Sequence, residues 1–146
     1  MRFVIGADHG GYELKEQLIR YLKDMEHEIL DVGTDSPASV DYPDICIKAC
    51  DVFISHGSFD FVILICGTGI GMSMCANRYH GVIRCAVCND ETSALMSRKH
   101  NNANVIALGA RIIDYKTAKT NLDIFINTEF ERGRHLRRLN KLPIIT

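Results

Sequence analysis

Mostly apolar short segments alternate along this chain with longer segments whose apolar residues recur every three or four positions. The apolar segments, which predict strands, are 2–8, 27–33, 59–66, 82–88 and 103–109. The intervening segments, which predict amphipathic helices, are 11–25, 42–57, 70–79, 90–100 and 115–130. Strands that alternate with helices in this way form a parallel sheet with helices on both of its faces. The pattern therefore predicts an α/β fold.

The core of this fold can be read from the same pattern. The segment FDFVILIC is apolar without alternation, which is typical of a central parallel strand buried on both faces. Two helical segments carry clear apolar stripes, and the residues predicted to face the core are Leu14, Leu18, Tyr21, Leu22 and Met25 in the first and Ala118, Leu122 and Phe125 in the last. Ligands bind such sheets at the carboxyl ends of the strands, so the loops that follow the strands are the ones to search.

Length and composition narrow the class of protein. A chain of 146 residues with 47% hydrophobic content suits one domain, residues 1–146, with a sizeable core. A net charge of -1 argues against a protein that binds nucleic acid through overall charge. No run of eighteen apolar residues predicts a membrane helix, and the apolar stretch at the N-terminus is too short for a signal peptide.

The six cysteines lie inside apolar segments, which favours free thiols in a reducing compartment and predicts a cytoplasmic protein. Cys85 and Cys88 have the C-x-x-C spacing of redox and zinc sites. In a strand, however, residues three positions apart point to opposite faces of the sheet and cannot easily share a metal ion. We therefore predict that both are packed core residues.

A glycine loop, CGTGIGMS, follows the third predicted strand and opens a helix. The dinucleotide-binding pattern needs glycine where the chain has Met72, and the triphosphate-binding pattern needs a G-K-[ST] triplet that the sequence lacks. Two interpretations remain: a turn that needs flexible residues, or converging backbone amides that stabilise a negative charge formed during a reaction. Three glycines at alternate positions favour the second.

Reactive side chains follow several of the strands and helices. Cys66 precedes the glycine loop, where a thiolate could serve as nucleophile or base, although a buried cysteine is an equal alternative. Asp8 and His9 follow the first strand, and His100 ends the fourth helix. A helix cap is the plain alternative for Asp8 and for His100.

Arginines near the C-terminus form a second candidate feature. If the segment RGRHLRRLNK is helical, Arg134 and Arg138 share one face, and paired arginines suit a phosphate group. A solvated tail is the alternative, and no aromatic residues interleave to support binding of single-stranded nucleic acid. The sequence contains no metal-ligand motif. Together the candidates fit an acid–base enzyme that acts on a small phosphorylated substrate.

Several motifs of the chain occur in the order GADHGG, DVGT, DYP, ILICGTGIGMSMCANR, SRKHNNANV, LGAR and GRHLRRL. In this set the chain resembles the type B ribose-5-phosphate isomerases, within the larger group that includes galactose-6-phosphate isomerase subunits. The resemblance implies a three-layer α/β/α sandwich around a Rossmann-like five-stranded parallel sheet. It also implies a homodimer or a dimer of dimers with the active site between two subunits, and an enzyme of the pentose phosphate pathway that interconverts D-ribose 5-phosphate and D-ribulose 5-phosphate without metal or organic cofactor.

The resemblance also assigns roles to residues of this chain. It implies that Cys66 is the base that moves a proton between carbons 1 and 2, and that His100 opens the sugar ring. The glycine loop that would stabilise the enediolate comprises Gly67, Thr68, Gly69, Ile70 and Gly71. The remaining residues implied to contact the substrate are Asp8, His9, Tyr42 and Asn101 near the sugar and Arg111, Arg134 and Arg138 at the phosphate.

Three alternatives remain open at this point. A hexose 6-phosphate isomerase of the same group, acting on allose or galactose 6-phosphate, would use the same chemistry. A dinucleotide-dependent oxidoreductase is disfavoured by Met72 and by the position of the glycine loop after the third strand. A sugar-phosphate sensor without activity would have no need for Cys66 and His100 together. The joint presence of these two residues also favours a self-sufficient homomeric isomerase.

Overall fold

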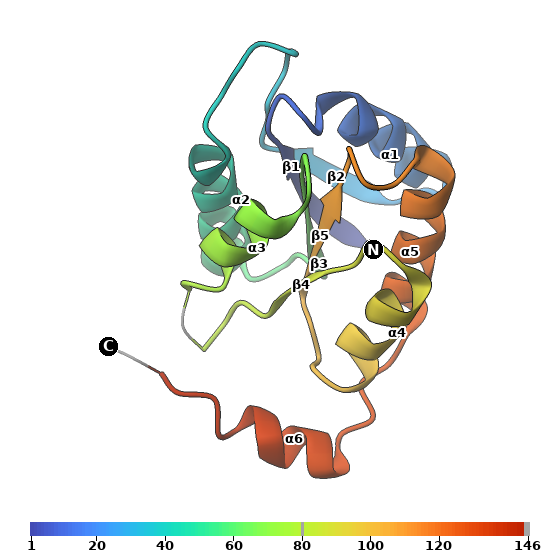
Figure 1. The fold of residues 1–146 in the computed structure, drawn as a ribbon. Helices are drawn as coiled ribbons and strands as arrows, with labels where there is room; N and C mark the ends of the chain where they lie inside the picture. The colour runs from blue at the N-terminus through green and yellow to red at the C-terminus, as the bar shows by residue number, and fades with distance from the viewer. Residues whose placement is uncertain (80, 145–146) are drawn as a thin grey trace.

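Five strands and six helices make up the computed structural model, which describes residues 1–79 and 81–144. The strands are β1 (Arg2–Ala7), β2 (Glu28–Asp31), β3 (Phe61–Cys66), β4 (Cys85–Val87) and β5 (Val105–Gly109). The helices are α1 (Tyr12–Asp24), α2 (Tyr42–His56), α3 (Ile70–Ala76), α4 (Glu91–Lys99), α5 (Tyr115–Asn127) and α6 (Gly133–Leu139). All strand pairs are parallel, in the order β2-β1-β3-β5-β4, which confirms the predicted fold class (Figure 1). His80, Ile145 and Thr146 lie outside the described residues.

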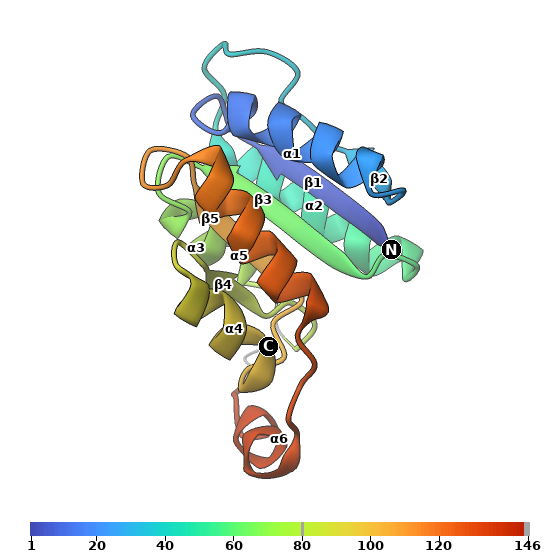
Figure 2. The ribbon, with the colours of Figure 1, turned by 90° about the vertical axis from the view of Figure 1, so that its right-hand side faces the viewer.

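Helices cover both faces of this sheet. Helices α1, α4 and α5 pack on one face, and α2 and α3 pack on the other (Figures 1 and 2). Neighbouring residues of β1 show why both faces are needed, because Phe3 and Ile5 join the first core cluster while Val4 joins the second. A central strand that is apolar at every position must be covered on both sides, as the sequence pattern indicates.

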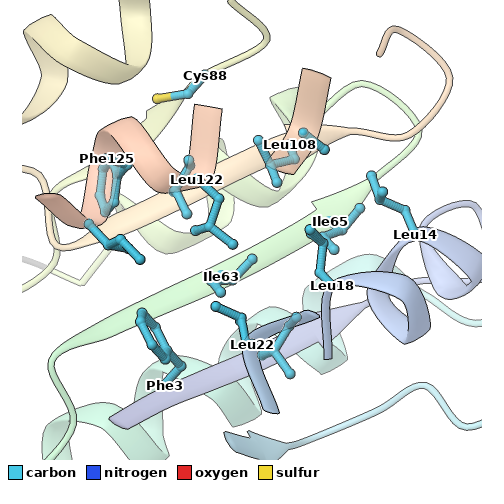
Figure 3. Packing of buried hydrophobic residues seen from close by; sticks show 14 of the residues in the cluster. Phe3, Leu14, Leu18, Leu22, Ile63, Ile65, Cys88, Leu108, Leu122 and Phe125 are labelled. Carbon is cyan, nitrogen blue, oxygen red and sulfur yellow. The ribbon is translucent and has the colours of Figure 1, made fainter. Parts of the chain in front are cut away.

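The larger core cluster lies between the sheet and helices α1 and α5. Leu18 and Leu22 of α1 contact the strands from one side, and Leu122 and Phe125 of α5 complete the layer (Figure 3). These side chains are fully buried, and burial of each contributes roughly 1.5–3 kcal/mol before the entropy cost of folding. Packing of apolar side chains, rather than helix propensity, therefore holds these helices on the sheet.

Several sequence-based element ends are wrong, including that of the helix expected over 115–130, which ends at Asn127, and two others have a visible reason. Met25 is more than half exposed, because α1 ends at Asp24 and Met25 forms its C-cap instead of joining the core. The helix expected over 70–79 ends at Ala76, where the side chain of Asn77 exchanges two hydrogen bonds with the backbone of Cys85. These bonds turn the chain toward β4.

The order of the strands places a switch point between β1 and β3. The chain leaves β1 toward β2 on one side, and it later returns to place β3 on the other side of β1. The loops that follow these two neighbouring strands therefore diverge, which makes this the switch point at which open α/β sheets bind ligands. Asp8 follows β1 and Cys66 ends β3, and the backbone amide of Asp8 donates to the carbonyl of Ile65 at 3.1 Å.

A buried lysine fixes the end of β1. Lys15 of α1 has no exposed side-chain surface and donates hydrogen bonds to Glu16 and Asp31. Burial alone would lower the pKa of Lys15, but the hydrogen bonds to the two carboxylates outweigh it and raise the pKa above its ordinary value. The other oxygen of Asp31 accepts from the amide of Gly33, whose carbonyl accepts from Ala7. This chain of contacts holds the backbone that leads directly into Asp8.

Helix α6 confirms the helical interpretation of the arginine-rich segment. It lies at the bottom of the molecule in both views, below α4 and away from the loops that follow β1 and β3 (Figures 1 and 2). Its arginines are exposed, and His135 is its only buried residue. Arg134 and Arg138 are one helical turn apart, as the spacing predicts.

Candidate active site

A first group of predicted site residues meets at the carboxyl ends of β1, β3 and β5. Asp8 is nearly buried there, and its Oδ1 accepts hydrogen bonds from the amides of Gly10 at 2.9 Å and Gly11 at 3.2 Å. These bonds account for the tight loop that leads into α1. The carboxylate of Asp8 therefore has a fixed orientation at the carboxyl end of β1.

Cys66 occupies the last position of β3, with 5% of its surface exposed. The backbone amide of Gly69 donates to its sulfur, with the nitrogen 3.2 Å from Sγ. Gly69 reaches this position with a φ of 81°, a left-handed conformation that favours glycine, and it forms the N-cap of α3. The loop therefore wraps its backbone around the thiol.

Asn89 clamps the glycine loop to β5, a role that sequence reasoning missed. Its Nδ2 donates to the carbonyl of Thr68 at 3.1 Å, and its Oδ1 accepts from the amide of Gly109 at 2.8 Å. Position 109 has no room for a side chain, because a β-carbon there would lie 2.6 Å from the backbone oxygen of Thr68. The only available signal was the position of Asn89 just after the fourth predicted strand.

Arg111 and Tyr42 pack against the two ends of the glycine loop. A β-carbon on Gly67 would lie 3.0 Å from Nη1 of Arg111, so the guanidinium covers the start of the glycine loop. A β-carbon on Gly71 would lie 2.9 Å from the ring of Tyr42, so the aromatic ring packs against the other end of that loop. His9 is held nearby through contacts of its Nδ1 with the backbone of Val40. A thiol, a carboxylate and a guanidinium thus surround one loop of backbone amides.

A second group of predicted residues lies at the opposite edge of the sheet. Helix α4 begins after the carboxyl end of β4 and runs back, so His100 and Asn101 at its end reach the edge where the strands begin. Hydrogen bonds show this directly, because Asn104 accepts from Val62 at the start of β3 and donates to Arg84 just before β4. Helix α6, which carries the exposed Arg134 and Arg138, lies toward the same edge (Figure 2).

His100 is part of a cluster that the sequence spacing did not reveal. Its ring stacks on that of His135 with centroids 4.1 Å apart and an angle of 11° between the planes. Oε2 of Glu131 lies 3.5 Å from Nε2 of His135 and 3.9 Å from Nε2 of His100. Within the described residues, these three side chains are the group whose ligand atoms are close enough to hold a metal ion. Parallel rings cannot both direct an in-plane lone pair at one ion, so the observed arrangement suits hydrogen bonding better than chelation.

The chain as a whole is similar to known proteins. A family model described as Ribose/Galactose Isomerase matches residues 3–142. This chain belongs to the ribose/galactose isomerase family. It is 37% identical over 144 residues to ribose-5-phosphate isomerase B of Escherichia coli strain K12, covering 99% of this chain and 95% of the relative.

Solved structures of the family share the fold closely. Ribose-5-phosphate isomerase B of Clostridium thermocellum is similar with a TM-score of 0.93 and 45% identity, covering 97% of this chain and 94% of that one. The Mycoplasma genitalium enzyme, solved with bound ribulose-5-phosphate, has a TM-score of 0.90 and 35% identity, covering 96% of this chain and 92% of its own. In the ranges 1–79 and 81–144, this family member has no helix with the length and apolar content needed to cross a membrane.

The glycine loop of this isomerase provides a stability test. Gly69→Ala places a side chain at positive φ and brings its β-carbon within 3.2 Å of the backbone of Leu108. We expect the free energy of unfolding, measured by urea denaturation, to fall by roughly 2–3 kcal/mol. Gly57→Ala is the matched control, because Gly57 also has positive φ but a β-carbon there meets no atom within 4 Å. An equal loss in both variants would show that the contact with β5 contributes nothing.

Proposed function

We propose that this chain interconverts D-ribose 5-phosphate and D-ribulose 5-phosphate by proton transfer through an enediolate. The observation that carries the proposal is the position of Cys66 at the start of the glycine loop. Its sulfur accepts a hydrogen bond from the backbone amide of Gly69. Asp8 and Arg111 border the same loop. The similarity to an enzyme solved with bound ribulose-5-phosphate supports the choice of a pentose phosphate.

Opening of the sugar ring is the first step. The anomeric hydroxyl loses its proton, the bond between carbon 1 and the ring oxygen breaks, and the ring oxygen gains a proton. His100 suits this exchange, because a neutral imidazole accepts a proton at one nitrogen and donates from the other. The side chain of His100 is partly exposed, so a sugar can reach it.

Proton transfer between carbons follows in the open chain. The thiolate of Cys66 removes the proton from carbon 2 of the aldose, and the electron pair moves to the oxygen on carbon 1. Amides of the glycine loop, which includes Thr68 and Ile70, are the donors placed to stabilise that oxygen. The hydroxyl on carbon 2 then loses its proton, the oxygen on carbon 1 gains one, and Cys66 returns its proton to carbon 1 to give the ketose.

We assign the binding of the phosphate group to three arginines. Arg111 lies beside the glycine loop, and Arg134 and Arg138 present two guanidinium groups on one face of α6. Guanidinium groups bind phosphate through paired charge-assisted hydrogen bonds, which fixes the sugar chain relative to Cys66. Tyr42, His9 and Asn101 are the remaining groups that we assign to the sugar.

The two groups of residues lie at opposite edges of one chain, so we propose that the enzyme is a homodimer, or a dimer of dimers, with shared sites. Cys66 of one copy then works with His100 of the other. Exposed apolar residues support such an interface, since Ile47 and Met74 line a hollow of about 580 Å³ beside Tyr42. A surface of this kind on a small protein marks a binding face.

We also propose that the chain forms one domain and that the enzyme works in the cytoplasm. The two core clusters draw on elements from β1 through α5, which supports a single folding unit. All six cysteines are free thiols, which supports a reducing compartment.

The assay that tests this function compares three substrates with purified enzyme: ribose 5-phosphate, allose 6-phosphate and galactose 6-phosphate. We expect ribose 5-phosphate to have the highest kcat/KM, roughly tenfold or more above either hexose, because an additional carbon must fit between the phosphate ligands and Cys66. A preference for a hexose phosphate would keep the chemistry and change the substrate. Absence of conversion with all three sugars would contradict the proposed function.

A further inference from the structure

Helix α6 contains one residue whose burial the proposed function does not explain. Its neighbours on this helix are exposed and mostly basic, yet only 7% of the surface of His135 is exposed. What covers it is the ring of His100, stacked almost parallel at a centroid distance of 4.1 Å. One face of the partly exposed His100 ring therefore rests on a second imidazole rather than on an apolar side chain.

Glu131 lies between the end of α4 and this pair of rings. Its Oε1 lies 3.2 Å from Nζ of Lys99, and its amide donates to the carbonyl of Lys99 at 3.0 Å. Its other oxygen faces Nε2 of both histidines. The carboxylate therefore lies beside the last residue of α4 and faces the Nε2 edge of the His100 ring. In the described part of the chain, no hydrogen bond engages Nδ1 of His100, which leaves that nitrogen for a sugar.

The charges around the stack determine how it responds to pH. Lys99 at the end of α4 and Arg134 and Arg138 on α6 are positive, and Glu131 is the one negative group facing the rings within the described residues. Burial lowers the pKa of His135 below its ordinary value, and His100 and Arg134 lower it further. These effects favour the neutral form of His135, and a flat neutral ring can stack on His100 without repulsion.

We propose that His135 is a positioning residue for the ring-opening step, holding the imidazole of His100 flat and oriented toward the sugar. The inference rests on the proposed function, because it assigns to His135 an effect that acts only through His100. Misplacement of an acid–base group by about 1 Å is enough to slow a step strongly. The proton transfer at Cys66 does not involve this pair of rings, so His135 should affect one step and leave the other unchanged.

Two reactions separate these steps in the same enzyme. Conversion of ribose 5-phosphate requires the sugar ring to open. In ribulose 5-phosphate the oxygen on carbon 5 carries the phosphate, so the sugar is an open chain. Exchange of its carbon 1 proton with deuterium from the solvent therefore uses Cys66 as the base and does not require ring opening. Measuring both reactions in wild type, His135→Ala and His135→Phe isolates the effect on ring opening. Arg137→Ala, an exposed change on the same helix, is the control.

We expect His135→Ala to lower kcat for ribose 5-phosphate by roughly tenfold or more, with deuterium exchange within about twofold of wild type. His135→Phe restores a flat stacking ring and should recover most of the conversion at neutral pH. Because phenylalanine takes no proton, the fall in conversion as the pH drops through the lowered pKa of His135 should be shallower in this variant than in wild type. Arg137→Ala should leave both reactions unchanged.

An equal loss of conversion and exchange in His135→Ala would overturn the proposal, since it would mean that His135 only holds the structure together. Unchanged conversion in His135→Ala would overturn it as well, as would His135→Phe behaving like alanine. If wild type neither converts ribose 5-phosphate nor exchanges deuterium into ribulose 5-phosphate, the proposed function itself fails. A wild type active in both reactions, with His135→Ala unaffected in both, would remove only the inference about His135.

Discussion

Cys66→Ala should lower isomerisation of ribose 5-phosphate by about a thousandfold, because the variant lacks the thiol that we propose carries the proton between carbons 1 and 2. Deuterium exchange into ribulose 5-phosphate should disappear with it, since that reaction uses the same base. The fold should persist, because the change removes one buried sulfur at a strand end and leaves the apolar core around β3 in place. Circular dichroism and a thermal melt measure that persistence.

The matched control is Cys75→Ala, which removes a partly buried thiol of α3 that is not among the proposed site residues. We expect it to retain most of the wild-type turnover. His100→Asn completes the comparison, because it should slow conversion of the cyclic sugar while preserving deuterium exchange. Retention of more than about a tenth of the activity by Cys66→Ala would contradict its role as the base.

Sequence periodicity was sufficient for the fold because the strands differ so clearly from the helices. Strand β3 is apolar at every position, and this pattern by itself predicts a place at the centre of the sheet. The alternation of elements then leaves few topologies, since parallel crossovers are right-handed. Element ends were harder to predict, because they depend on contacts such as those between Asn77 and Cys85, which are separated by a turn.

The candidate site was predictable where its residues follow one another closely in the chain. The glycine loop and Cys66 form one continuous segment, and Asp8 lies at the end of the strand beside it. The cluster of His100, Glu131 and His135 was not predictable, because α5 separates its members in sequence and only tertiary packing unites them. The role of Asn89 was not predictable for the same reason, since it bridges the glycine loop after β3 and the end of β5, which are far apart in the sequence.

The groups of residues around Cys66 and around His100 are far apart within one chain, and this separation constrains how copies of the chain must assemble. No rearrangement of side chains can bring His100, at the edge where the strands begin, to Cys66 at the edge where they end. A second copy can supply it, and a twofold axis would then create two equivalent sites per dimer. Each site would contain Cys66 from one chain and His100 from the other. Two different inactive variants could therefore complement one another in a mixed dimer.

Mixing Cys66→Ala with His100→Asn, followed by unfolding and joint refolding, should therefore restore about a quarter of wild-type conversion of ribose 5-phosphate. About half of the refolded dimers are mixed, and each mixed dimer has one site with both Cys66 and His100 intact. The control mixes Cys66→Ala with the double variant, in which no dimer contains an intact site and conversion should stay at background. Recovery in the first mixture alone would establish a shared site. If both mixtures stay inactive while wild type refolds to full activity, Cys66 and His100 do not act together across an interface, and the ring-opening role must pass to a residue at the same edge of the sheet as Cys66.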